Sequence, residues 1–152
     1  MANEVNRIQD QLQRSLAGNA WHGPALLELL ADVNAAKAAA HPIQDAHSIW
    51  ELVLHIATWN KVGVARLDGG PGEPSDEENF PAVTDVSEAA WARTLDYLKE
   101  SFRELLAAIA AVDEARLDQP IVEGKSSIYV TLHGVIQHGL YHAGQIAILK
   151  KI

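Results

Sequence analysis

The segment from Ser48 to about Leu67 predicts a helix that is apolar on nearly every side. Ser48 suits the N-cap position and Glu51 follows three residues later, which is the capping-box pattern. The glycine- and proline-containing run at 69–72 then ends the helix. A helix that is apolar all round has to be buried on all sides. We therefore expect it at the centre of the fold, or buried on its far side by another subunit.

Three other long segments carry apolar residues at helical spacing, and none of the rest of the chain predicts a convincing pair of strands. These helices are expected over residues 3–16, from about 85 to 111, and from a start between 127 and 131 to the end of the chain. Together with the 48–67 helix they predict an all-α fold, a four-helix bundle that forms one domain over residues 1–152.

Shorter elements are predicted between the long helices. Pro24 suits the first position of a short helix over 25–33. Short turns are expected at 35–40 and 113–117, and a short extended piece in the connector 120–129. The bundle should thus carry one or two short extra helices.

Charge and composition exclude several classes of function. The formal net charge is −8 and no run is rich in lysine or arginine, so no nucleic-acid partner is expected. The chain contains no cysteine, so any metal must be held by nitrogen and oxygen atoms. The first residues lack the pattern of a signal peptide and no apolar run is long enough to span a membrane, which predicts a cytoplasmic protein without a membrane partner.

The segment from Gly69 to Thr84 is long for a loop in so small a domain. It contains several prolines and the acidic run 76–78. Long loops are commonly lids, binding loops or mobile segments. We expect this one to lie near the mouth of a site.

His138 and His142 are four residues apart on the last helix, which places both imidazoles on one face, about one turn apart. Gln145 shares that face, whereas His133 lies roughly 140° away from it and is not expected to take part. Two histidines so spaced can bind one divalent metal. Spacing alone is more typical of histidines whose nitrogens are satisfied by backbone or water.

His55 is a third histidine within an apolar helix, where no solvent-exposed face is evident for it. Helical bundles build metal sites from side chains on facing helices. Three neutral imidazoles suit zinc, nickel or iron(II) and leave coordination positions open, as in catalytic sites. The alternative is three core histidines that bind no metal.

Other residues are candidates for the surroundings of this site. Trp59 lies one turn after His55 and predicts a pocket wall, and Gln145 and Tyr141 are further candidates for pocket residues. Glu51 can accept a hydrogen bond from a ligand imidazole, although its capping-box role is the favoured interpretation. The remaining histidines, 22, 41 and 47, are expected to be ordinary polar residues.

Two segments resemble the motifs of a known family. Residues 48–59 read SIWELVLHIATW and residues 134–146 read GVIQHGLYHAGQI. Both resemble the DinB family of DNA-damage-inducible four-helix proteins, in its YfiT-like branch of metal-dependent hydrolases, and the order of helices matches as well. The resemblance implies a divalent metal bound by His55, His138 and His142, and frequent homodimers. Gly139 departs from the family pattern, in which many members carry an acidic residue.

The resemblance leaves the reaction open, because a fold and a metal site do not fix a chemistry. Members of the family are described as hydrolases, and others resemble transferases or isomerases that use a low-molecular-weight thiol. We therefore expect a metal-dependent enzyme of the hydrolase type acting on a small molecule. The alternatives are a thiol-dependent transferase or isomerase, and a non-catalytic metal-binding or dimeric interaction protein. The sequence offers no clean candidate for a general base.

Overall fold

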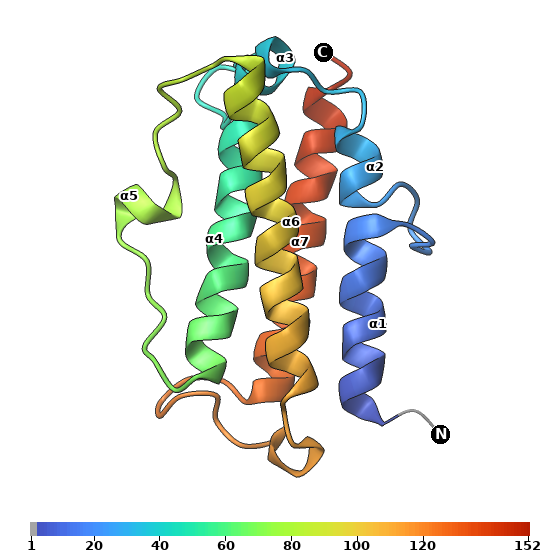
Figure 1. The fold of residues 1–152 in the computed structure, drawn as a ribbon, viewed down its shortest axis with the longest axis vertical. Helices are drawn as coiled ribbons and strands as arrows, with labels where there is room; N and C mark the ends of the chain where they lie inside the picture. The colour runs from blue at the N-terminus through green and yellow to red at the C-terminus, as the bar shows by residue number, and fades with distance from the viewer. Residues whose placement is uncertain (1–2) are drawn as a thin grey trace.

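The computed structural model describes residues 3–152 and is built from four long helices (Figure 1). They are α1 (Glu4–Ala17), α4 (Ile49–Leu67), α6 (Glu88–Ala110) and α7 (Ile128–Leu149). The described part of the chain contains no strand; an isolated antiparallel bridge joins Pro120 to Ser127 in the connector before α7. The predicted all-α four-helix bundle is therefore confirmed.

The direction of the helices explains the long segment between α4 and α6. In Figure 1, α1 and α7 run in one direction, and α4 and α6 run in the other. The chain must therefore return along the bundle before α6 can begin. α6 has 23 residues, which corresponds to about 35 Å at a rise of about 1.5 Å per residue. The segment 69–87 is a crossover connection of the kind that some four-helix bundles use, and it passes beside α4.

The structure contains more short helices than the sequence predicted. They are α2 (Leu26–Leu30), α3 (Ala35–Ala39), α5 (Asp76–Asn79) and the 3-10 turn η1 (Glu114–Arg116). The short helix predicted over 25–33 is present as α2 but is shorter, because it ends at Leu30, and Pro24 lies outside it, because Ala25 is the N-cap. The crossover was predicted as a loop throughout, yet Ser75 caps the single turn of α5 by accepting a hydrogen bond from the Glu78 N–H.

Serine residues are the N-caps of three long helices. Ser48, Ser87 and Ser127 each accept a hydrogen bond from the backbone N–H three residues later. Such caps satisfy an N–H group that has no partner within the helix. At Ser48 the capping box is complete, since the carboxylate of Glu51 accepts from the Ser48 N–H at 2.7 Å. The predicted starts of α4 and α7 are confirmed.

α4 has no exposed residue between Ile49 and Leu67, as its all-round apolar sequence predicted. It packs against α6, α7, α3 and α5. Two buried polar contacts join it to α6: Trp50 Nε1 donates to Thr94 Oγ1 at 2.9 Å, and Asn60 Nδ2 donates to Ser101 Oγ at 3.1 Å. Gly63 permits the close approach of its neighbours, because a Cβ there would lie 3.2 Å from Leu105 Cδ1. Within residues 3–152, no helix has both the length and the apolar character needed to cross a membrane.

Candidate metal centre

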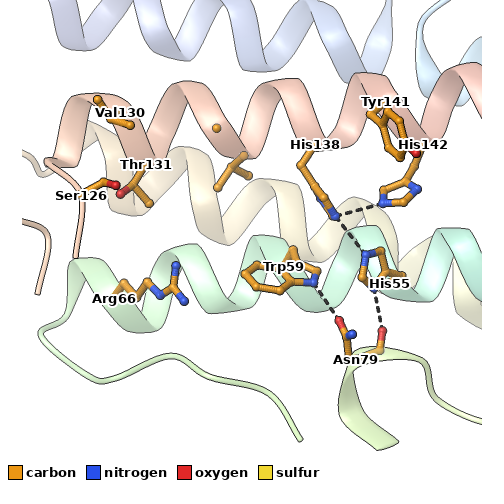
Figure 2. A pocket seen from close by; sticks show the side chains of 12 residues that line it. His55, Trp59, Arg66, Asn79, Ser126, Val130, Thr131, His138, Tyr141 and His142 are labelled. Atoms are coloured by element: carbon orange, nitrogen blue, oxygen red, sulfur yellow. Dashed lines mark hydrogen bonds between the residues drawn. The ribbon is translucent and has the colours of Figure 1, made fainter. Parts of the chain in front are cut away.

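Three histidines from the two helices α4 and α7 meet between them (Figure 2). His138 Nε2 lies 3.0 Å from His55 Nε2 and 3.1 Å from His142 Nε2. His55 and His142 are buried, and His138 is partly buried. The potential ligand atoms of the three residues all lie within 4.8 Å of one another, which is the arrangement of a group that can hold a metal ion.

The outer nitrogen of two of these rings faces an oxygen atom. His55 Nδ1 lies 2.8 Å from the backbone carbonyl oxygen of Asn79, and His142 Nδ1 lies 2.6 Å from Oε1 of Gln145. Both oxygens can only accept, so each Nδ1 carries the ring proton and donates it. The Nε2 atoms of His55 and His142 consequently present lone pairs to the space between the helices. Metal-binding histidines are oriented by outer partners in this way.

The donor set of the three rings fits a bound cation. A neutral imidazole carries one N–H, so His138 Nε2 can donate to only one of the two Nε2 atoms that face it. At least one of the two short contacts therefore brings two lone pairs together, which is unfavourable unless a cation lies between them. Nitrogens bound to one ion at about 2.0–2.1 Å lie about 3 Å apart, and this agrees with the 3.0 and 3.1 Å separations.

Burial keeps the three rings neutral and therefore able to bind a metal. It lowers the pKa of His138 to about 4, with a smaller contribution from the neighbouring His142 and His55. Burial also lowers the pKa of His55 and of His142, although the hydrogen bonds to Asn79 and Gln145 oppose the change. An imidazole can coordinate a metal only through an unprotonated nitrogen.

The crossover segment closes one side of the histidine group. α5 is joined to α4 by hydrogen bonds from Trp59 Nε1 to Asn79 Oδ1 at 2.9 Å and from Thr58 Oγ1 to the Glu78 carbonyl at 3.0 Å. Phe80, which follows α5, stacks on the His55 ring with a centroid distance of 4.1 Å. The expectation that this segment lies beside the site agrees with these contacts.

A cavity of about 510 Å³ opens from the histidines along the groove between α4 and α7 (Figure 2). Its size is in the range of small-molecule sites. Trp59 lines its middle, and Arg66 lines it together with Ser126 and Thr131 at the end away from the histidines. Among the described residues, no aspartate or glutamate lines this cavity.

The residues predicted from sequence take different places around the cavity. Trp59 and Tyr141 line it, and Tyr141 is largely exposed. Gln145 does not line it: its side chain lies behind His142, because it bonds the Nδ1 that faces away from the other histidines. Glu51 has the capping-box role and lies 3.1 Å from Nε2 of His41.

Sequence reasoning missed several residues of the site. Asn79 acts on His55 through its backbone carbonyl, which leaves no signal in a side-chain pattern. Phe80 lies between His55 and His47 and stacks on both rings, so His47 is part of the surroundings of the site rather than an ordinary polar residue. Arg66 was not singled out, although its place eleven residues after His55 puts it three turns along the same helix, on nearly the same face.

The fold and the histidine group together are those of a helical bundle that can hold a metal ion. A four-helix bundle with three converging histidines on facing helices is an arrangement in which bundles hold metal ions. The family model of the DinB superfamily matches residues 20–146, so the chain belongs to the DinB superfamily.

A solved structure shares the fold of this chain. It is the crystal structure of a conserved protein from Enterococcus faecalis, which aligns with a TM-score of 0.75 at 19% sequence identity over 99% of this chain and 97% of that one. At this identity the likeness concerns the fold alone. Comparison with curated proteins finds no match.

Proposed function

We propose that this protein is a metal-dependent enzyme of the hydrolase type that acts on a small organic molecule. Its metal ligands are His55, His138 and His142, and the metal is zinc, nickel or iron(II). The observation that carries the proposal is the convergence of three Nε2 atoms at the end of an open cavity of about 510 Å³. A divalent ion held there would supply Lewis-acid chemistry, which lowers the pKa of a coordinated group and polarises a carbonyl.

The protein's own side chains hold and orient the reacting groups in this proposal. Asn79 and Gln145 keep the protons of His55 and His142 on Nδ1, so both Nε2 atoms stay available as ligands. Trp59 and Tyr141 form walls of the cavity that faces the three nitrogens. Phe80 covers the His55 ring and excludes water from that side of the site.

Transfer to or from a low-molecular-weight thiol is the second candidate function. It is favoured by the lack of an aspartate or glutamate among the described residues that line the cavity. Hydrolysis benefits from a nearby general base, whereas a thiol, with an ordinary pKa of about 8.5, needs little assistance to ionise. The chain has no cysteine, so the thiol would be a cosubstrate.

A homodimer is a further part of the proposal. Three large apolar side chains of α7 are exposed: Val130 by 54%, Tyr141 by 66% and Ile148 by 61%. Exposed apolar patches are typical of protein–protein interaction sites. Size-exclusion chromatography with light scattering tests this: a mass of twice 16.5 kDa supports pairing, and a mass of 16.5 kDa at all concentrations contradicts it.

Metal analysis tests the site directly. Protein purified without a histidine tag should bind one divalent ion per chain, and His138→Ala should abolish binding. His133→Ala is the matched control, because His133 lies on the same helix outside the group.

An activity assay tests the reaction. Metal-loaded protein is incubated with esters and amides, with and without small thiols; turnover that needs a thiol supports transfer over hydrolysis. Absence of bound metal with every tested ion would contradict the proposal.

A further inference from the structure

Arg66 is a cation without a partner inside the cavity that the histidines share. Four other arginines each pair with a carboxylate on the protein surface; these are Arg7, Arg14, Arg93 and Arg103. Within residues 3–152 no such ion pair forms at Arg66, and its Nε is buried without a hydrogen-bond acceptor. Buried polar groups are normally hydrogen-bonded, so an unpaired one that lines a cavity indicates an acceptor supplied by a ligand.

The rest of the Arg66 side chain is held in place, which directs the guanidinium along the cavity. Its guanidinium carbon lies 5.7 Å from the centre of the Trp59 ring, a cation–π contact. Gly72 of the crossover lies so close to the Arg66 stem that a Cβ at residue 72 would be 2.7 Å from Arg66 Cγ. The carboxylate of Glu73 accepts a hydrogen bond from Lys125, which is the main reason that the pKa of Glu73 is lowered. The charge of Arg66 makes only a smaller contribution to that change.

Arg66 and the histidines are near enough to bind the two ends of one small molecule. Trp59 lies between them: its ring centre is 5.7 Å from the Arg66 guanidinium carbon and 5.7 Å from the centre of the His138 ring. The guanidinium can therefore lie no farther from His138 than twice that distance. Trp59 forms the wall between the two ends, and Val130 and Val135 are further apolar residues that line the cavity (Figure 2).

We propose that the ligand of this cavity is a small organic carboxylate whose acid group binds Arg66 and whose other end faces the three histidines. The guanidinium fork matches a carboxylate with two parallel hydrogen bonds. Its single positive charge matches that of a carboxylate, and Arg66 is the only lysine or arginine among the described residues that line the cavity, so no second side-chain cation is present for a phosphate dianion. Ser126 and Thr131 lie at the same end of the cavity and add hydroxyl groups (Figure 2). The inference rests on the proposed function, since it names the class of substrate for the same site.

The test uses a carboxylate and its uncharged amide of the same shape. 3-Phenylpropionate, 3-phenylpropanamide and phenyl phosphate are titrated by NMR into metal-free protein, so that binding at Arg66 is measured without the metal. The wild type should bind the carboxylate at least about tenfold more tightly than the amide, the usual effect of a charge-assisted hydrogen bond. Arg66→Gln should remove this preference. Arg103→Gln, which removes an exposed arginine elsewhere, should retain it.

Specific outcomes would overturn the inference. Equal affinity of the wild type for the acid and the amide contradicts the inference. A preference for the carboxylate that survives in Arg66→Gln contradicts it as well, and so does tighter binding of phenyl phosphate than of the carboxylate. Arg66→Lys replaces this variant if Arg66→Gln does not fold. Lysine keeps the positive charge but loses the two parallel hydrogen bonds of the guanidinium, so the preference for the carboxylate over the amide should fall several-fold but persist. A carboxylate preference in a protein that binds no metal supports the Arg66 site and contradicts only the proposed metal-dependent function.

Discussion

The carbonyl oxygen of Asn79 holds the His55 ring from the side opposite His138, at 2.8 Å from Nδ1. Asn79 is the last residue of α5 in the crossover, and His55 lies on α4. The same asparagine accepts a hydrogen bond from Trp59 through its side chain. One residue of a connecting segment therefore sets both the tautomer of a proposed ligand and the position of a cavity wall.

Removing the Asn79 side chain tests whether α5 positions His55. Asn79→Ala leaves the Trp59 Nε1–H without its acceptor, which should destabilise the protein by about 1 kcal/mol and loosen α5. Metal affinity should fall several-fold, because the carbonyl that orients His55 is less firmly placed. Hydrogen exchange at residues 76–80 and a metal titration measure the two effects. Glu77→Ala, on the same short helix, is the control; equal behaviour of both variants would contradict this role.

Gln145 should act on the metal through His142. Gln145→Leu removes the acceptor of the His142 Nδ1 proton, and we expect metal affinity to fall by about 10–100-fold with the fold intact. Gln145→Glu keeps an acceptor at this position and should restore affinity. Calorimetric titration with zinc or nickel provides the measurement. Unchanged affinity in Gln145→Leu would show that His142 is oriented by packing alone.

Acid should destabilise the metal-free protein through the three histidines. The pKa of His138 in the folded protein is about 4, chiefly because of burial, against an ordinary value of 6.5 in an unfolded chain. Between these values the unfolded chain binds protons that the folded protein excludes, so the free energy of unfolding falls as the pH decreases below about 6.5 and is insensitive above it. The lowered pKa values of His55 and His142 act in the same direction.

Urea unfolding at pH 7.5, 6 and 5 measures this dependence, and His138→Gln should flatten it. A free energy of unfolding that stays constant from pH 7.5 to 5 in the wild type would contradict the prediction. Divalent metal should raise the free energy of unfolding at pH 7.5, by about 2.7 kcal/mol when its concentration is 100 times the dissociation constant.

Gly72 should be required for the crossover to pack on α4. Its φ is +51°, and a Cβ would lie 2.9 Å from the Val62 carbonyl oxygen. Gly72→Ala therefore combines backbone strain with a clash against backbone, and we expect a loss of about 1–3 kcal/mol. Gly124 is a matched control, since its φ is also positive, +76°, but no atom lies near its Cβ position. Thermal unfolding of both variants should show the larger loss for Gly72→Ala.

Much of the fold was predictable because its signals are local. The Ser48 cap and helical spacing predicted the long helices, and the all-round apolar character of 49–67 predicted the burial of α4. The convergence of His55 with His138 and His142 followed from two buried helices that each carry histidine on an apolar face. Metal binding by these three histidines stays a prediction, and so does the cytoplasmic location of the protein.

The rest depended on contacts that sequence spacing does not describe. Asn79 acts through a carbonyl oxygen that every residue type possesses, so no residue pattern could reveal it. Gln145 shares a helical face with His138, yet its rotamer directs it behind His142. Spacing could have placed Arg66 on nearly the same helix face as His55, but its lack of a hydrogen-bond acceptor becomes evident only in the folded structure.

The sequence separation of the three histidines also bears on the order in which the site can form during folding. His138 and His142 are one turn apart, so they meet as soon as α7 is helical, within about a microsecond for an isolated helix. His55 is 83 residues away from His138 in sequence and joins them only after α4 has docked, which requires closure of a long loop. A metal ion present during refolding can therefore bind the α7 pair first and should accelerate the docking of α4, so that it acts as a nucleus for assembly as well as a part of the finished site.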